Sequence, residues 1–113
     1  MKDISIEELD FKKMGGIMPA VIQDANTQEV LTVVFVNEEA LRLTMRTGFV
    51  HRWSRTSQRI IMKGETSGNT QRVKRILTDC DVDSVIFLVE PKGPACHTGE
   101  RTCFHKEMKG FVG

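Results

Sequence analysis

Two apolar, β-branched segments separated by a short polar turn constrain the fold of this chain most strongly. The segments are residues 17–23 and 30–36, and Asp-Ala-Asn-Thr-Gln lies between them at 24–28. These turn residues favour a chain reversal, so the sequence predicts a β-hairpin. Because the second segment is almost continuously apolar, we expect it to be buried on both faces.

The residues that follow have the pattern of an α-helix at about 38–47. Asn37 is a favourable N-cap, and two glutamates come next, where the helix dipole favours acids. Leu41 and Thr44 fall on one helical face, and Gly48 is a natural stop. We expect no other clear helix.

The remaining pattern is that of short strands joined by polar loops. Strands are predicted at 49–53, 59–63, 71–77 and 84–90, and loops at 64–69 and 91–99. The expected fold class is therefore mainly β, with α+β character only at the margins. We expect a single domain over 1–113, with a lead-in at 1–15 and a tail at 105–113.

Composition excludes several classes of protein. A chain of 113 residues with 27% charged and 40% hydrophobic residues is typical of a globular domain. Its net charge of +1 provides no general attraction to nucleic acid or to an anionic membrane. No run approaches the roughly 20 apolar residues of a membrane span. The first 13 residues lack the apolar core of a signal peptide, so we expect a cytoplasmic protein.

Charge is unevenly distributed along the chain. Between residues 51 and 75 there are seven arginines and lysines, and Glu65 is the only acid. Three aspartates, Asp79, Asp81 and Asp83, come directly afterwards. This order suits a phosphorylated ligand beside a divalent cation, although an unevenly charged solvated surface also explains it.

Cys80, Cys96 and Cys103 are the only cysteines. An odd number in a chain expected in the cytoplasm favours thiol or metal chemistry over a disulfide framework. Three thiolates can hold zinc and leave its fourth position for a water that ionises near neutral pH. Three buried free thiols are the alternative.

The aspartates alternate with other residues, as side chains do along a strand. On a strand, Asp79, Asp81 and Asp83 would share one face and Cys80 would point to the other. Converging carboxylates repel unless a cation neutralises them, and Mg²⁺ prefers oxygen ligands. A polar edge strand is the alternative. An EF-hand is excluded because Ser84 occupies the position that requires glycine.

Two further features can take part in chemistry. His97 follows Cys96 in a polar loop, and an imidazole can transfer protons near neutral pH or bind a metal, as His105 also can. The Gly- and Ser-containing loop at 64–69 can hold a phosphate through its amides, although an ordinary hairpin turn explains it equally well.

Together these motifs resemble the phosphoribosyl-AMP cyclohydrolase family. The matching segments are PAVIQD at 19–24, WSR at 53–55, KGETSGN at 63–69, DCDVD at 79–83, GPACHTG at 93–99, and CF at 103–104. The resemblance implies hydrolysis of the N1–C6 bond in the adenine ring of phosphoribosyl-AMP, during histidine biosynthesis, by zinc-bound hydroxide. It also implies a barrel-like fold in an intertwined homodimer.

The resemblance further implies a role for each candidate residue. Zinc would be bound by Cys80, Cys96 and Cys103, with ligands from both subunits, and magnesium by Asp79, Asp81 and Asp83. His97 would handle protons. The small-molecule substrate, a phosphorylated nucleotide, would contact Trp53, Arg55, Lys63, Glu65 and Ser67.

Two positions depart from the family pattern. Ser57 stands where the family carries a second arginine, Ile61 stands where it has tryptophan, and the chain has no tyrosine. Other readings therefore stay open: a paralogous zinc hydrolase for another purine-like nucleotide, a non-enzymatic nucleotide- or nucleic-acid-binding module, or a structural zinc protein whose fourth ligand is His97 or His105.

Overall fold

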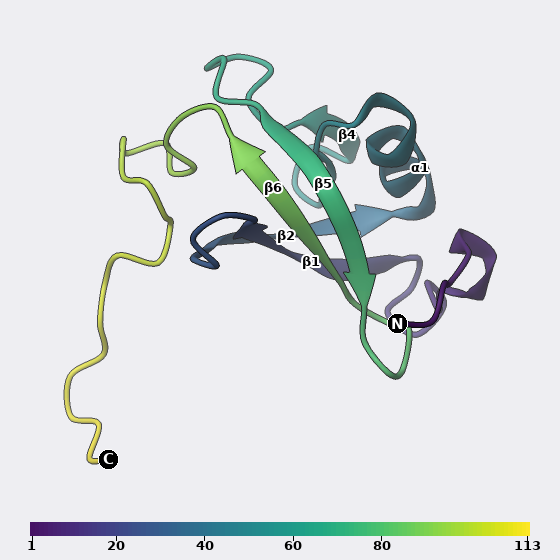
Figure 1. Cartoon of the computed structure of the whole chain (residues 1–113), viewed down its shortest axis with the longest axis horizontal. Helices are drawn as coiled ribbons and strands as arrows, with labels where there is room; N and C mark the ends of the chain where they lie inside the picture. The colour runs from purple at the N-terminus through teal and green to yellow at the C-terminus, as the bar shows by residue number, and fades with distance from the viewer.

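A four-stranded sheet forms the centre of the computed structural model, which describes residues 1–113 (Figure 1). The predicted hairpin is present: β1 (Ile17–Asp24) pairs antiparallel with β2 (Val30–Asn37). On its other side β1 pairs parallel with β6 (Val85–Pro91), which pairs antiparallel with β5 (Gln71–Thr78). The strand order is β2-β1-β6-β5.

The predicted helix is confirmed as α1 (Glu38–Thr47). The Asn37 side chain accepts a hydrogen bond from the Ala40 backbone N–H at 2.8 Å, as an N-cap does. Gly48 ends the helix in the left-handed conformation, with a φ of 83°. Helix α1 packs against β2 and against β3 (His51–Ser54).

Strand β3 pairs antiparallel with β4 (Arg59–Met62) in a separate two-stranded sheet. A single turn of 3-10 helix, η1 (Ile6–Glu8), lies in the N-terminal segment. The prediction of a mainly β fold with one α-helix is confirmed, but the two sheets do not close into a barrel. No helix is long and apolar enough to cross a membrane.

The core lies on one face of the central sheet. Alternate residues of β1 are buried, from Met18 to Asp24, because successive side chains of a strand point to opposite faces. Strand β2 is at the edge of the sheet, so Val30 and Val33 are 41% and 43% exposed. The expectation that this apolar segment is buried on both faces is therefore wrong.

The C-terminal residues run away from the body of the molecule (Figure 1). Phe104, Met108 and Phe111 are among the large apolar side chains that are exposed there. The preceding residues, 95–103, which we call the cysteine loop, return to the sheet instead: the backbone N–H of Cys103 donates to the Leu31 carbonyl at 2.7 Å.

Candidate functional site

A basic hollow lies between β2 and the β3–β4 hairpin. Its volume is about 330 Å³. One wall is formed by residues 32–35 of β2, and the other carries side chains that can bind an anion. The lining residues from the hairpin region are Arg52, Ser54, Arg55, Thr56 and Lys63. Three cations and two hydroxyls around one hollow suit a phosphate group.

Two contacts fix the cations of the basic hollow. The Arg55 guanidinium lies over the Phe35 ring, 4.0 Å from its centroid, in a cation–π contact. The Lys63 ammonium donates a hydrogen bond to the Ala95 carbonyl at 2.8 Å. Because Ala95 precedes Cys96, this contact joins the hollow directly to the cysteine loop.

Three other predicted substrate residues lie near the basic hollow but do not line it. Trp53 is half-buried on β3. Glu65 accepts a hydrogen bond from the Met62 backbone N–H at 3.0 Å, and Ser67 accepts one from the Asn69 backbone N–H at 3.2 Å. Glu65 and Ser67 therefore shape the loop that follows β4.

Gly64 is required by the geometry of this same loop. Its φ is +85°, and a Cβ built on it would lie 2.4 Å from the Asn69 carbonyl carbon. No side chain fits so close to backbone, so the loop that begins at Lys63 needs glycine at this position.

Cys96 is the most protected thiol of the chain. It is 9% exposed, and the Thr98 hydroxyl donates to its sulfur at 3.1 Å. Hydrogen bonds from the Thr98 hydroxyl and backbone, then from His105 and Cys103, outweigh desolvation and lower the pKa of Cys96 to about 6. His105 Nε2 lies 3.8 Å from this sulfur, whereas His97 is exposed. A metal-binding thiolate is thus favoured here at neutral pH.

The three aspartates do not alternate along a strand, the arrangement in which they would have shared one face. Strand β5 ends at Thr78, and residues 79–84, here called the acidic turn, reverse the chain into β6. Val82 has a φ of +55°, which a β-branched residue rarely adopts and which a strand does not contain. Asp79 accepts a hydrogen bond from the Asp83 backbone N–H at 3.1 Å, so the carboxylates surround a turn instead of alternating along a strand.

Each carboxylate of the acidic turn has a different environment. Desolvation opposes ionisation of Asp79, but hydrogen bonds from Ser84 and Asp83 outweigh it and lower the pKa. Asp83 forms an ion pair with Lys13, at 2.6 Å between Oδ2 and Nζ. Asp81 is exposed, and its Oδ1 lies 3.8 Å from the exposed Cys80 sulfur.

The acidic turn and the cysteine loop lie at opposite ends of β6 (Figure 1). A strand of seven residues spans roughly 20 Å at about 3.3 Å per residue. Accordingly, no group of three His, Cys, Asp or Glu side chains that could hold a metal ion comes together within one chain. The chain presents two half-sites: two thiols and a histidine near Cys96, and one thiol with carboxylates at Cys80.

A second, larger hollow lies beside the acidic turn. Its volume is about 980 Å³, and Cys80 and Asp79 line it together with the N-terminal segment and β5. Most of its other lining residues are apolar, such as Ile4, Leu41 and Ile76. The lone thiol of this half-site therefore faces an open, largely apolar surface.

From the sequence, Arg52 was only one of seven basic residues and was not named as a substrate residue, and β2 was given no role in the site. Strand alternation was the available signal for Arg52, because Arg52 and Ser54 lie on the same face of β3, with Arg55 directly after it. For Thr32 to Phe35 no signal was available, since an apolar segment does not reveal that it lies at a sheet edge.

The fold and its sites define a small, mainly β protein that presents a basic hollow next to a thiol-rich loop. The family model for phosphoribosyl-AMP cyclohydrolase matches residues 32–105. The phosphoribosyl-AMP cyclohydrolase of Cenarchaeum symbiosum is 58% identical over 91% of this chain and 95% of its own length. That of Nitrosopumilus maritimus is 55% identical over 95% of this chain and 99% of its own length.

A longer protein is also similar. The histidine biosynthesis bifunctional protein HisIE of Pyrococcus furiosus is 50% identical over 91% of this chain, which matches 49% of that protein. The chain belongs to the phosphoribosyl-AMP cyclohydrolase family, and the enzyme class predicted from its motifs is confirmed.

Proposed function

We propose that the chain hydrolyses the N1–C6 bond of the adenine ring in phosphoribosyl-AMP, as a homodimer whose zinc ligands come from both subunits. One observation carries the proposal: Lys63 belongs to the basic hollow and also contacts Ala95, next to Cys96. A phosphate in the hollow would therefore hold the rest of a nucleotide close to the cysteine loop.

The basic hollow accounts for the substrate phosphates. Arg55 and Lys63, with Arg52, supply charge and hydrogen-bond donors, and Arg55 is kept in place by the Phe35 ring. Trp53 offers an aromatic face beside them, and Glu65 and Ser67 belong to the loop that continues from Lys63. We propose that Trp53 and Glu65 contact the sugar and base, and that Ser67 contributes to binding of the phosphates.

The donor set fits zinc only when two chains contribute. Cys96 and Cys103 would bind it from one subunit and Cys80 from the other, because about 20 Å of strand separates Cys80 from Cys96 within a chain. The low pKa of Cys96 supplies the thiolate that zinc requires. When bound, zinc would supply the Lewis-acid chemistry that makes water a nucleophile at neutral pH.

His97 is the proposed proton carrier. Addition of water to C6 and cleavage of the N1–C6 bond leave N1 in need of a proton, and an imidazole ring nitrogen can donate it near neutral pH. His97 follows the buried Cys96 directly, and its own side chain is exposed, so it can meet a bound nucleotide.

The acidic turn is the proposed magnesium site. Asp79, Asp81 and Asp83 place three carboxylates within one short turn, and only Asp83 is paired with a cation, Lys13. Because no three of these side chains converge within one chain, Mg²⁺ would be held by one or two of the carboxylates, with water and a substrate phosphate as its other ligands.

We also propose that the enzyme works in the cytoplasm, in histidine biosynthesis. All three cysteines are free thiols, which suits a reducing compartment.

The two departures from the family pattern do not favour another substrate. Neither Ser57 nor Ile61 lines the basic hollow. Ser57 donates its backbone N–H to the Ser54 hydroxyl at 3.1 Å, and Ile61 lies on β4 opposite Arg52. The hollow therefore keeps its cations, and phosphoribosyl-AMP remains the substrate we propose.

Turnover of phosphoribosyl-AMP by the purified protein tests the proposal. Absorbance would follow the reaction with and without a zinc chelator, and metal content would be determined on the same sample. We expect chelator-sensitive turnover with about one zinc per chain. Bound zinc without turnover would show that phosphoribosyl-AMP is not the substrate. Turnover that the chelator does not reduce would show that zinc is not required for the reaction.

A further inference from the structure

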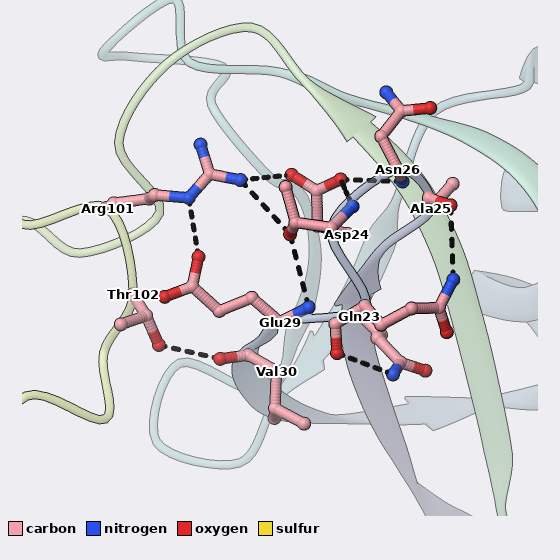
Figure 2. A network of polar contacts seen from close by, with 10 residues as sticks. Gln23, Asp24, Ala25, Asn26, Glu29, Val30, Arg101 and Thr102 are labelled. Carbon is pink, nitrogen blue, oxygen red and sulfur yellow. Dashed lines mark hydrogen bonds and ion pairs between the residues drawn. The ribbon is translucent and has the colours of Figure 1, made fainter.

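Arg101 lies between Cys96 and Cys103 and reaches across to the turn between β1 and β2 (Figure 2). One guanidinium nitrogen, Nη2, donates to Asp24 Oδ2, and Nε donates to Glu29 Oε1. Nη2 also donates to the Thr27 hydroxyl at 3.3 Å. A single side chain thus connects the cysteine loop to a turn more than 70 residues earlier in the sequence.

Asp24 is a rigid receptor for this arginine. Its side chain is only 5% exposed, and its Oδ1 accepts the backbone N–H groups of Asn26 at 2.8 Å and Thr27 at 3.1 Å. Burial raises the pKa of Asp24, but these two N–H groups and the Arg101 guanidinium outweigh burial and lower it. The two backbone N–H groups thus fix the orientation of the carboxylate within its own turn, independently of the cysteine loop.

Backbone contacts carry this fixation to both thiols. Next to Arg101, the Thr102 hydroxyl donates to the Val30 carbonyl at 2.7 Å, and the Cys103 N–H donates to Leu31. The Arg101 carbonyl accepts the Ala95 N–H at 3.1 Å, which closes the loop just before Cys96. Arg101 therefore joins the two ends of the loop and attaches both to the sheet.

We propose that Arg101 is a positioning residue for the metal ligands: it holds Cys96 and Cys103 in a zinc-binding arrangement before zinc arrives. The inference rests on the proposed zinc site. A loop that must become ordered on binding has a lower affinity, because only the fraction of molecules in the competent arrangement binds. Lysine cannot replace the arginine fully, since one ammonium cannot match the fork that pairs with Asp24 and Glu29.

The test compares Arg101→Gln and Arg101→Lys with a matched control, Arg42→Gln. Arg42 also bridges two carboxylates, Glu7 and Glu38, but neither belongs to the cysteine loop or to the β1–β2 turn. Zinc affinity would be measured on the full-length protein by competition with a chromophoric chelator. We expect Arg101→Gln to weaken zinc binding about 10–100-fold, as loss of supporting contacts around a metal does, and Arg101→Lys to recover part of it. The control should stay within about twofold.

Amide hydrogen exchange of the metal-free protein provides a readout that a general loss of stability would not reproduce. In Arg101→Gln, the amides of Cys96 and Cys103 should exchange at least about tenfold faster, while amides of β1 and β6 keep their protection. If Arg101→Gln does not fold, Asp24→Asn provides the same test, since its amide oxygen can still accept the turn N–H groups.

The outcomes separate this inference from the proposed function. If Arg101→Gln, or Asp24→Asn in its place, binds zinc as tightly as the control does, Arg101 is not a positioning residue. That result would leave the proposed zinc enzyme intact. Faster exchange across the whole sheet, matched by the loss of zinc, also overturns the positioning role, because Arg101 would then be an ordinary stabilising residue. Absence of zinc from the unmodified protein overturns the proposed metal site itself, and the inference with it.

Discussion

The two loops at the ends of β6 each carry cysteine, but the Cys96 thiol is buried and the Cys80 thiol is exposed. The cysteine loop is anchored to the sheet, and its Cys96 is buried with a pKa of about 6. The acidic turn presents an exposed Cys80 beside carboxylates and contains Val82 in a strained conformation. One loop is anchored and favours a thiolate, whereas the other is open and exposed to solvent.

If the proposed three-thiol site exists, this difference explains how a chain of 113 residues would form it without folding around the metal. Strand β6 keeps Cys80 and Cys96 apart, so the fold excludes an intramolecular site. Two chains can combine the cysteine loop of one with the acidic turn of the other. A two-fold axis would generate this combined site twice per dimer.

The basic hollow is joined to the cysteine loop by the hydrogen bond from Lys63 to Ala95. If the substrate phosphate binds there, the cations of the hollow should determine substrate affinity. Arg55→Gln should raise the KM for phosphoribosyl-AMP about 10–100-fold with little change in kcat, because a charge-assisted hydrogen bond contributes about 1.5–3 kcal/mol. Steady-state kinetics would measure it. Arg59→Gln is the control, since Arg59 lies on the same hairpin and does not line the hollow. An unchanged KM in Arg55→Gln would show that the substrate phosphate does not bind in the basic hollow.

The anchor of the cysteine loop should also be visible in stability. Asp24→Asn should reduce the free energy of unfolding by about 1–2 kcal/mol at pH 7, because charged hydrogen bonds to a buried carboxylate are lost. The folded-state pKa of Asp24 is lowered, so its contribution is complete above the unfolded pKa of about 3.9 and disappears as pH falls through the lower folded pKa.

Denaturant unfolding at pH 7 and pH 3 would measure both effects of Asp24→Asn. The difference between the variant and the unmodified protein should shrink at pH 3. A difference that is independent of pH would show that the ionised form of Asp24 does not stabilise the fold.

Thiol reactivity should distinguish Cys96 by its pH dependence. In the metal-free protein, the alkylation rate of Cys96 should rise about tenfold between pH 5 and pH 7, because the thiolate forms with a pKa of about 6. Mass spectrometry would identify the modified residue. Thr98→Ala, which removes the hydroxyl donor to its sulfur, should shift this rise to higher pH. A Cys96 that gains reactivity only above pH 8 would contradict the account.

The smallest effect belongs to the strain in the acidic turn. Val82→Gly should stabilise the protein by about 1 kcal/mol, because glycine adopts a positive φ without steric cost and this gain exceeds its own entropic penalty. The thermal midpoint would report it. Val33→Gly is a suitable control: Val33 is 43% exposed on an edge strand, so glycine there should destabilise. Equal destabilisation by both variants would show that Val82 is not strained.

Local signals predicted much of this fold. The Asn37 cap, the Gly48 stop and the polar turn at 24–28 act within a few residues, so the helix and hairpin could be read directly from the chain. The shared face considered for the three aspartates is absent, because a side chain–backbone hydrogen bond, from Asp83 N–H to Asp79, supports a turn and not a strand.

The site was only partly predictable for a different reason. Its motifs are local, so the cysteines, aspartates and basic residues could be identified as candidates, and their roles stay predictions. Arg101 and Asp24 are 77 residues apart, and nothing in either local sequence indicates that they meet. Likewise the edge position of β2, which forms a wall of the basic hollow, depends on the strand order of the whole sheet.

Mixing two inactive variants would show whether the zinc site is shared between two chains. Cys80→Ser and Cys96→Ser would each be purified, shown to lack turnover of phosphoribosyl-AMP, and then dissociated and reassociated together in equal amounts. A mixed dimer contains one complete site, with Cys80 from one chain and Cys96 and Cys103 from the other. With random pairing, about a quarter of the unmodified activity should return, because half of the dimers are mixed and each has one of two sites intact. A mixture that exchanges subunits and stays inactive would contradict a site shared between two chains.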